Sequence, residues 1–203
     1  MITEILLGNL VEMTPEEFLS SSVWVARIKT YFKLMDVNGD GFLSLSDYEA
    51  IADRLVELQG NSSNYEEIMT LFRDLFQNMI AGGASVDANT MIREEELVAN
   101  AAKAVSVLQS APAVGTRKNE VFFDIIDTNK SGEISREEYR KYLAIYSGGD
   151  QPERADKAFD SIDADGNGSI TRTEFIEGHM GYWFTHPSNQ SHTPLPYGPL
   201  VEA

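Results

Sequence analysis

The stretch DVNGDGFLSLSD, Asp36 to Asp47, has oxygen-bearing side chains at its first, third, fifth, ninth and twelfth positions, which we call places one to twelve. A hard cation such as calcium takes about six to eight oxygen ligands, and a loop of this length can supply most of them. Place six is Gly41, and glycine adopts the positive φ of a sharp turn without steric cost. The spacing predicts a calcium-binding loop, although a single copy would leave a solvated acidic turn as the alternative.

The same pattern recurs in DTNKSGEISREE (127–138) and DADGNGSITRTE (163–174). Glycine again stands at place six, and place eight is aliphatic in all three loops, as expected where paired EF-hand loops meet in a short strand. Three such matches identify EF-hand calcium loops. The predicted metal ligands include the place-seven carbonyl and the place-nine residue, often bridged by water; they are Asp36, Asn38, Asp40, Phe42, Ser44, Asp47, Asp127, Asn129, Ser131, Glu133, Ser135, Glu138, Asp163, Asp165, Asn167, Ser169, Thr171 and Glu174.

The residues that flank each loop predict helices. An aromatic residue stands four positions ahead of each first ligand, namely Phe32, Phe123 and Phe159, and an aliphatic residue or Met stands one position ahead. This spacing lays an apolar stripe along an incoming helix, and apolar residues at helical period follow each loop. We therefore expect an all-α fold, a compact four-EF-hand globule of two EF-hand pairs with an irregular C-terminal tail.

Because EF-hands form pairs, three loops imply a further hand between Asp47 and Asp127. Helical patterns over 65–80 and near 88–110 leave room for its loop. One register puts Thr90 at place six, where a β-branched residue is strained, and no carboxylate at place one. Another register uses Val86 as the strand residue and offers fewer ligands. In either case we expect this second hand to pair with the first without binding metal; the first register's ligand places hold Ser85, Asp87, Asn89 and Glu96.

The expected organisation is an N-terminal EF-hand pair with an N-terminal extension over 1–110, a C-terminal pair over 111–184 and a docked tail over 185–203. APAVGTRKN (111–119) is expected to link the pairs, and SGGDQPE (147–153) to link the last two hands. Thr14 followed by Pro15 has the form of a helix start. The tail holds four of the seven prolines, so it is not a long helix, but it has apolar residues that can dock: Leu195, Tyr197, Leu200 and Val201.

Composition narrows the class of partner and the compartment. The net charge is −16, and three bound Ca²⁺ ions would leave roughly −10. Lys and Arg are scattered, which argues against nucleic acid and anionic membranes as partners. There is no apolar run of membrane-spanning length, the start MITEILLGNL lacks the basic flank of a signal peptide, and position two is not the glycine that myristoylation needs. The absence of cysteine fits a cytoplasmic location, and we expect a monomer.

With these residues in view, the chain resembles the invertebrate sarcoplasmic calcium-binding proteins from about Trp24 onward. The similar stretches are RIKTYF before loop one, AGG with Val-Asp in the second hand, DTN…ISREEY in the third hand and GPLV near the end. The resemblance implies a mostly helical four-hand globule in which hands one, three and four are active. It also implies calcium buffering in the cytosol instead of target capture.

Two related families, the coelenterazine-binding proteins and the calcium-triggered photoproteins, share that fold. GHMGYWFT (178–185) resembles the photoprotein C-terminal stretch, and WVARIK (24–29) resembles the photoprotein first helix. Ile28 occupies the histidine position of that helix, so half of the polar cavity lining is absent. The resemblance implies that a luciferin site would use the following residues, for which core and tail packing is the alternative: Trp24, Arg27, His179, Trp183 and Tyr197.

These observations predict a cytosolic Ca²⁺ and Mg²⁺ buffer or signal modulator with three sites. The alternative is a coelenterazine-type luciferin-binding or photoprotein-like protein, which releases or oxidises a small apolar ligand when calcium binds. An ordinary enzyme is not expected, because there is no cysteine and the histidines are confined to one end. Loop one ends in Asp47, one methylene shorter than glutamate, so we expect Mg²⁺ to compete most readily there.

Overall fold

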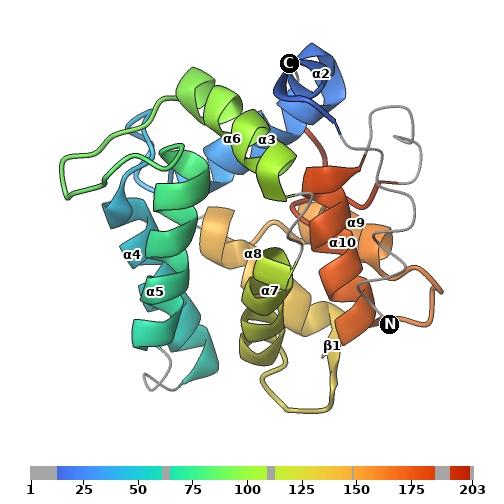
Figure 1. Ribbon diagram of the computed structural model, residues 1–203. Helices are drawn as coiled ribbons and strands as arrows, with labels where there is room; N and C mark the ends of the chain where they lie inside the picture. The colour runs from blue at the N-terminus through green and yellow to red at the C-terminus, as the bar shows by residue number, and fades with distance from the viewer. Residues whose placement is uncertain (1–12, 61–64, 109–112, 148, 186–192, 202–203) are drawn as a thin grey trace.

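The computed structural model describes residues 13–60, 65–108, 113–147, 149–185 and 193–201. In Figure 1, α4 and α5 lie on one side of the molecule, α9 and α10 on the other, and α7 and α8 between them. The N-terminal part contains α2 (Pro15–Ser20), α3 (Ser22–Met35), α4 (Leu45–Gln59), α5 (Tyr65–Leu75), the π-helical turn η2 (Phe76–Ile80) and α6 (Glu94–Leu108). The C-terminal part contains α7 (Ala113–Ile126), β1 (Glu133–Ser135), α8 (Arg136–Ser147), α9 (Pro152–Ile162), β2 (Ser169–Thr171) and α10 (Arg172–Phe184).

The predicted helix start at Thr14 is confirmed. Thr14 Oγ1 accepts the N–H of Glu17 at 3.3 Å, and the Glu17 carboxylate accepts the N–H of Thr14 at 2.8 Å. Pro15, which has no N–H to leave unpaired, is the first helical residue. This reciprocal capping box satisfies two N–H groups that the helix itself cannot pair.

Two expectations about element boundaries need correction. The segment predicted as a single helix over 65–80 changes to a π-helical turn after Leu75 and ends where Gly82 and Gly83 adopt positive φ. The segment 111–119, predicted as a link, is largely helical, because α7 begins at Ala113. Asn119 and Phe122 are both buried on one face of α7, and tertiary packing of such a face outweighs the weak helix propensity of the glycine near its start.

The four hands form two pairs, as expected. In the C-terminal pair β1 and β2 are antiparallel, with Ile134 opposite Ile170. In the N-terminal pair Leu43 and Ile92 exchange both backbone hydrogen bonds, at 2.8 and 2.9 Å. Ile92 is therefore place eight of the second loop, which makes Ser85 place one, and the alternative register with Val86 as the strand residue is wrong.

One hydrophobic core runs through both pairs. Phe122 of α7 contacts Phe72 of α5, with ring centroids 5.6 Å apart, and also contacts Tyr142 of α8 at 6.5 Å. The guanidinium of Arg54 on α4 donates to the carbonyl of Ile145 on α8. Packing thus crosses residue 110, and the division of the chain into an N-terminal EF-hand pair over 1–110 and a C-terminal pair over 111–184 stays a prediction.

The C-terminal tail is irregular and lies against the body over its described residues, 193–201. Arg154 of α9 donates to the carbonyls of Tyr197 and Pro199 at 2.8 and 3.2 Å. The backbone N–H of Val201 donates to Thr30 on α3 at 3.0 Å, so the tail joins the first hand to the fourth. Residues 186–192 of the predicted tail lie outside the described residues. In the described part of the chain, no helix has the length and apolar character that crossing a membrane requires.

Candidate metal centres and the interior between them

The three predicted calcium loops share one backbone arrangement around their first carboxylate. The place-one aspartate accepts the N–H of the place-six glycine at 2.8–3.0 Å and that of place five at 2.9–3.1 Å. The place-six glycines have φ between 84° and 89°, a region that disfavours other residues. The loops are thus closed into rings by backbone hydrogen bonds to Asp36, Asp127 and Asp163.

The side chains at places three and five follow the same scheme. The place-three oxygen accepts the N–H of place five at 2.8–3.0 Å, and the place-five side chain contacts the backbone of place seven at 2.8–2.9 Å. In loop four, carboxylate oxygens of Asp163, Asp165 and Glu174 lie within 4.8 Å of one another. Such a group of oxygens suits a hard divalent cation. The residues in these places are Asn38, Asp40, Phe42, Asn129, Ser131, Glu133, Asp165, Asn167 and Ser169.

Places nine and twelve are joined at the start of each exit helix. One oxygen of the place-twelve carboxylate accepts the N–H of place nine at 2.9 Å and its hydroxyl at 2.7–2.9 Å. A place-twelve residue therefore caps its own helix with one of its two carboxylate oxygens. The pairs are Ser44 with Asp47, Ser135 with Glu138, and Thr171 with Glu174.

The remaining oxygen of place twelve differs between loops. In loop three, Glu138 Oε1 reaches back across the loop and accepts the N–H groups of Thr128 and Asn129 at 3.0 and 3.3 Å. In loop four, Glu174 Oε1 accepts the N–H of Ala164 at 3.0 Å. In loop one, Asp47 Oδ1 is buried without a hydrogen-bond partner. A buried, unpaired carboxylate oxygen is costly unless a cation binds it, so the residues of loop one fit a metal ion.

The hydrogen bonds of Glu138 also control its ionisation. Burial opposes the charged form, but hydrogen bonds from the backbone and hydroxyl of Ser135, together with those from Thr128 and Asn129, outweigh that effect and hold the pKa of Glu138 below its usual value. Hydrogen bonds to a carboxylate favour its charged form. Glu138 is therefore ionised at neutral pH, as a calcium ligand must be.

The second loop lacks the features shared by the other three. Thr90 at place six does not adopt positive φ, unlike the glycine at that place in each other loop. Its hydroxyl donates to the Asp87 carboxylate at 3.1 Å, and Asn89 N–H donates to the same oxygen at 2.9 Å. Glu96 caps its helix through the N–H of Arg93 at 2.9 Å, as place twelve does in the three predicted calcium loops. The loop thus retains the exit-helix cap but not the closed ring, and its side chains are tied to its own turn.

The residues suggested for a luciferin site are buried, and two pairs of them are in contact. Trp24 Nε1 donates to the carbonyl of Trp183 at 3.0 Å, and Arg27 donates to the carbonyl of Tyr182 at 3.4 Å. His179 and Tyr197 have ring centroids 5.8 Å apart. Trp24 and Trp183 form core contacts between α3 and α10.

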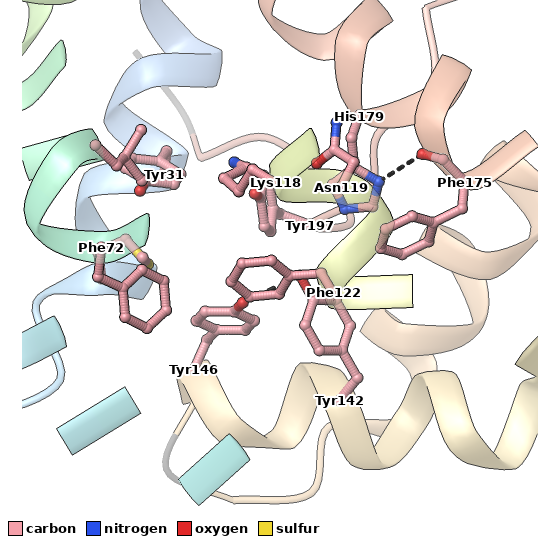
Figure 2. A pocket seen from close by; sticks show the side chains of 12 residues that line it. Tyr31, Phe72, Lys118, Asn119, Phe122, Tyr142, Tyr146, Phe175, His179 and Tyr197 are labelled. Carbon is pink, nitrogen blue, oxygen red and sulfur yellow. Dashed lines mark hydrogen bonds between the residues drawn. The ribbon is translucent and has the colours of Figure 1, made fainter. Parts of the chain in front are cut away.

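A small cavity lies between the two EF-hand pairs, beside His179 and Tyr197. Figure 2 shows Tyr31, Lys118, Asn119 and His179 along one side of it and the rings of Phe122, Tyr142 and Tyr146 along the other. Its free space is about 10 Å³, which is about the volume of one water probe. Lys118 and Asn119 are not among the residues predicted for a site, since they fall in the segment predicted as a link. They precede Phe122 by four and three residues, and this helical spacing is the signal that could identify them.

Two basic groups beside this cavity are less basic than usual. His179 Nδ1 pairs with the carbonyl of Phe175 at 2.8 Å, while its buried Nε2 has no partner. Burial lowers the pKa of His179 to about 3, although the Phe175 hydrogen bond acts in the opposite direction. Desolvation lowers the pKa of Lys118 to about 8. His179 is therefore a neutral imidazole at pH 7, with its Nε2 lone pair free to accept a hydrogen bond.

The chain matches two EF-hand family models, an EF-hand domain pair over residues 116–179 and an EF hand over residues 28–52. These segments contain the three predicted calcium loops. The luciferin-binding protein of Renilla reniformis is 30% identical over 74% of this chain and 80% of its own length. The sarcoplasmic calcium-binding protein of Hediste diversicolor is 28% identical over 62% of this chain and 70% of its own.

Solved structures agree with the fold. The coelenterazine-binding protein from Renilla muelleri, in its Ca-loaded apo form, has a TM-score of 0.58 at 28% identity, over 85% of this chain and 96% of that one. The photoprotein clytin has a TM-score of 0.69 at 23% identity, over 89% and 96% of the two chains. Together with the loop geometry, these matches show that the chain belongs to the calcium-binding EF-hand family that includes luciferin-binding protein, photoproteins and sarcoplasmic calcium-binding proteins.

Proposed function

We propose that the protein is a cytosolic calcium buffer or signal modulator that binds three Ca²⁺ ions, with Mg²⁺ competing at loop one. The observation that carries this proposal is the closed ring in loops one, three and four, in which a place-one carboxylate accepts the N–H of a place-six glycine. The same arrangement is missing in the loop that contains Thr90. The ligands are the eighteen residues named from the sequence.

A buffer fits the surface better than a sensor does. A sensor exposes a Met-rich apolar groove when it binds calcium. Among the described residues, the large apolar side chains that are exposed are Leu19, Met91 and Val107, on α2, the second loop and α6. The seven methionines are scattered along the chain, a distribution that does not indicate the Met-rich groove of a promiscuous sensor.

One observation favours a second candidate function, a luciferin-binding protein. The unpaired Nε2 of His179 faces the cavity between the pairs, and the relative from Renilla reniformis is a luciferin-binding protein. However, ligand pockets usually measure about 300–1,000 Å³, and this cavity has about 10 Å³. A luciferin would require α7, α10 and the tail to move apart, so the buffer is the better-supported function.

Calorimetric titration of the full chain tests the proposal. We expect three Ca²⁺ per chain for the wild type and two for the E174Q variant, which removes the place-twelve charge of loop four. A stoichiometry of four, or an unchanged count in E174Q, would contradict the ligand assignment. The absorption spectrum of the protein mixed with coelenterazine decides between the two functions. A tightly bound chromophore with a shifted spectrum would favour the luciferin-binding function over the buffer function.

A further inference from the structure

The two calcium loops of the C-terminal pair are joined by arginines that stand at place ten. Arg136, at place ten of loop three, lies over the ring of Phe159 with its guanidinium carbon 4.2 Å from the ring centroid. The same guanidinium binds Asp160 at 2.6 Å and contacts Asp156 at 3.6 Å. All three partners lie on α9, the helix that enters loop four. The exit of loop three is thereby attached to the entrance of loop four.

Arg172, at place ten of loop four, makes the reciprocal set of contacts. Its guanidinium carbon lies 4.2 Å from the centroid of Phe123, and its nitrogens reach Asp124 at 2.5 Å and the carbonyl of Glu120 at 3.3 Å. These partners lie on α7, the helix that enters loop three. In both directions the phenylalanine stands four positions, and the aspartate three positions, ahead of the first ligand. The two contacts are therefore related by the pseudo-two-fold symmetry of the pair.

The N-terminal pair does not have this arrangement. Its place-ten residues are Leu45 and Glu94. Glu94 forms an ion pair with Lys29 on α3 at 3.2 Å, which reverses the charges of the C-terminal contacts. Leu45 offers no charged group to the second hand. The reciprocal arginine contacts thus occur in the pair that has two closed loops and not in the pair that has one.

We propose that Arg136 and Arg172 couple the two C-terminal calcium sites, so that loops three and four bind Ca²⁺ cooperatively while loop one binds independently. This inference rests on the proposed function of these loops. Arg136 stands two residues before Glu138, in the same first turn of α8, and ligation of Glu138 fixes that turn. A fixed guanidinium then holds the last turn of α9, from which Asp163 enters loop four. Arg172 transmits the same constraint in reverse, and coupling between two sites is necessarily reciprocal.

The arginine contacts relay shifts between the exit helix of one loop and the entering helix of the other, and they add little to the free energy of unfolding. The Arg136 and Asp160 side chains are 36% and 63% exposed, and ion pairs at such exposure contribute little. A planar guanidinium that binds carboxylates along its edge and an aromatic ring with its face has few orientations available. A shift of the exit helix at one loop therefore changes the geometry of the entering helix at the other.

The test follows each loop separately in the full-length protein by NMR. The amide N–H groups of Gly132 and Gly168 donate to the place-one carboxylates at 2.8 and 3.0 Å, so their signals report the state of loops three and four. Typical coupling between sites changes affinity by about 5–150-fold. With coupling of about 100-fold, roughly a tenth of the molecules carry calcium in only one of the two loops at half-saturation, whereas independent equal sites give about half.

We expect the one-loop-loaded fraction to rise from about a tenth in the wild type to about half in R136Q/R172Q, at the strong end of typical coupling. R136K/R172K keeps the net charge but loses the planar fork, and it should show the same rise. K141Q is the matched control, because Lys141 pairs with Glu137 within α8 and not across the hands. A fraction near half in the wild type, an unchanged fraction in either double variant, or an equal rise in K141Q would overturn the coupling. If neither glycine signal responds to calcium in the wild type, the proposed function fails and the coupling fails with it.

Discussion

At the scale of single residues, place twelve separates loop one from the other two. The longer side chains of Glu138 and Glu174 span their loops, capping the exit helix with one oxygen and reaching the loop start with the other. Asp47 caps its helix but leaves Oδ1 buried without a partner. An aspartate held in this way offers one oxygen, which favours six ligands. Magnesium requires such octahedral coordination, whereas calcium gains from a seventh ligand.

We therefore predict that D47E raises the preference of loop one for calcium over magnesium by about tenfold, which corresponds to about 1.4 kcal/mol. The measurement is a calcium titration at fixed magnesium, followed through the amide signal of Gly41. E138D is the matched control, because it should lower the same preference in loop three. Unchanged selectivity in D47E would show that place twelve does not control ion choice.

His179 leads to a prediction about pH. Burial lowers its pKa to about 3 in the folded protein, while an unfolded histidine has a pKa of about 6.5. The unfolded chain thus binds the extra proton first, and His179 makes the fold less stable as the pH falls from 6.5 towards 3. Urea unfolding in chelator should show that H179Q loses about 2 kcal/mol less stability than the wild type between pH 7 and pH 5. Equal losses would mean that His179 is solvated or paired in the folded state.

At the scale of elements, the second loop differs from the three predicted calcium loops at only a few positions. Its strand residue Ile92 pairs with Leu43, and Glu96 caps the exit helix as in the other loops. Place one lacks a carboxylate, and place six lacks the positive φ that closes the ring. The missing place-one carboxylate and the missing positive φ at place six are needed for metal binding and not for pairing. The second loop can therefore still pair with the first.

The double variant S85D/T90G is predicted to bind an additional Ca²⁺. Ser85→Asp supplies the carboxylate around which the loop closes, and Thr90→Gly removes the Cβ that disfavours the turn and the hydroxyl that ties up Asp87. Calorimetry should give a count one higher than that of the wild type. T90G alone should leave the count unchanged, and an unchanged count in the double variant would place the defect elsewhere in the loop.

The docked tail is a second element whose contribution can be measured. Tyr197 is buried against Tyr31 of α3, Tyr146 of α8 and Tyr182 of α10, and Tyr139 donates to the carbonyl of Pro196 at 2.7 Å. We predict that Y197A destabilises the protein by about 3–4 kcal/mol. Deletion from Pro194 onward should cost more and should increase binding of an apolar dye. Equal melting and dye binding in the truncated protein would show that the tail contributes nothing.

At the scale of the whole molecule, calcium and folding are linked. Each loop holds several oxygens close together, and their charges repel unless a cation binds them. Binding to the folded state alone stabilises it by about 2.7 kcal/mol per site at a ligand concentration of 100 Kd. Three sites would contribute about 8 kcal/mol, so chelation should lower the melting temperature by roughly 20 °C. An equal melting temperature with and without divalent ions would reject this linkage.

The local parts of this protein could be predicted from its amino-acid sequence. The chemistry of each loop is local, because twelve consecutive residues include the ligands, the glycine and the strand residue. The flanking helices can be predicted from apolar residues that recur at helical spacing. The capped helix at Thr14 and the pairing of hands could be predicted for the same reason. The extent of α7 could not, because the link around Gly115 is helical only through packing of Asn119 and Phe122 against other hands.

The arrangement between the loops depends on contacts that no local pattern specifies. The register of the second hand depends on the pairing of Leu43 with Ile92, which lies 49 residues later in the chain. The cavity beside His179 brings together α3, α7, α8, α10 and the tail, and no local pattern specifies how closely these elements approach. The reciprocal contacts of Arg136 and Arg172 likewise join helices that are remote in sequence. The metal-ligand residues of each loop are neighbours in the sequence, so they can be predicted from it. The volume of the cavity and the contacts between loops arise from packing, which depends on the whole chain.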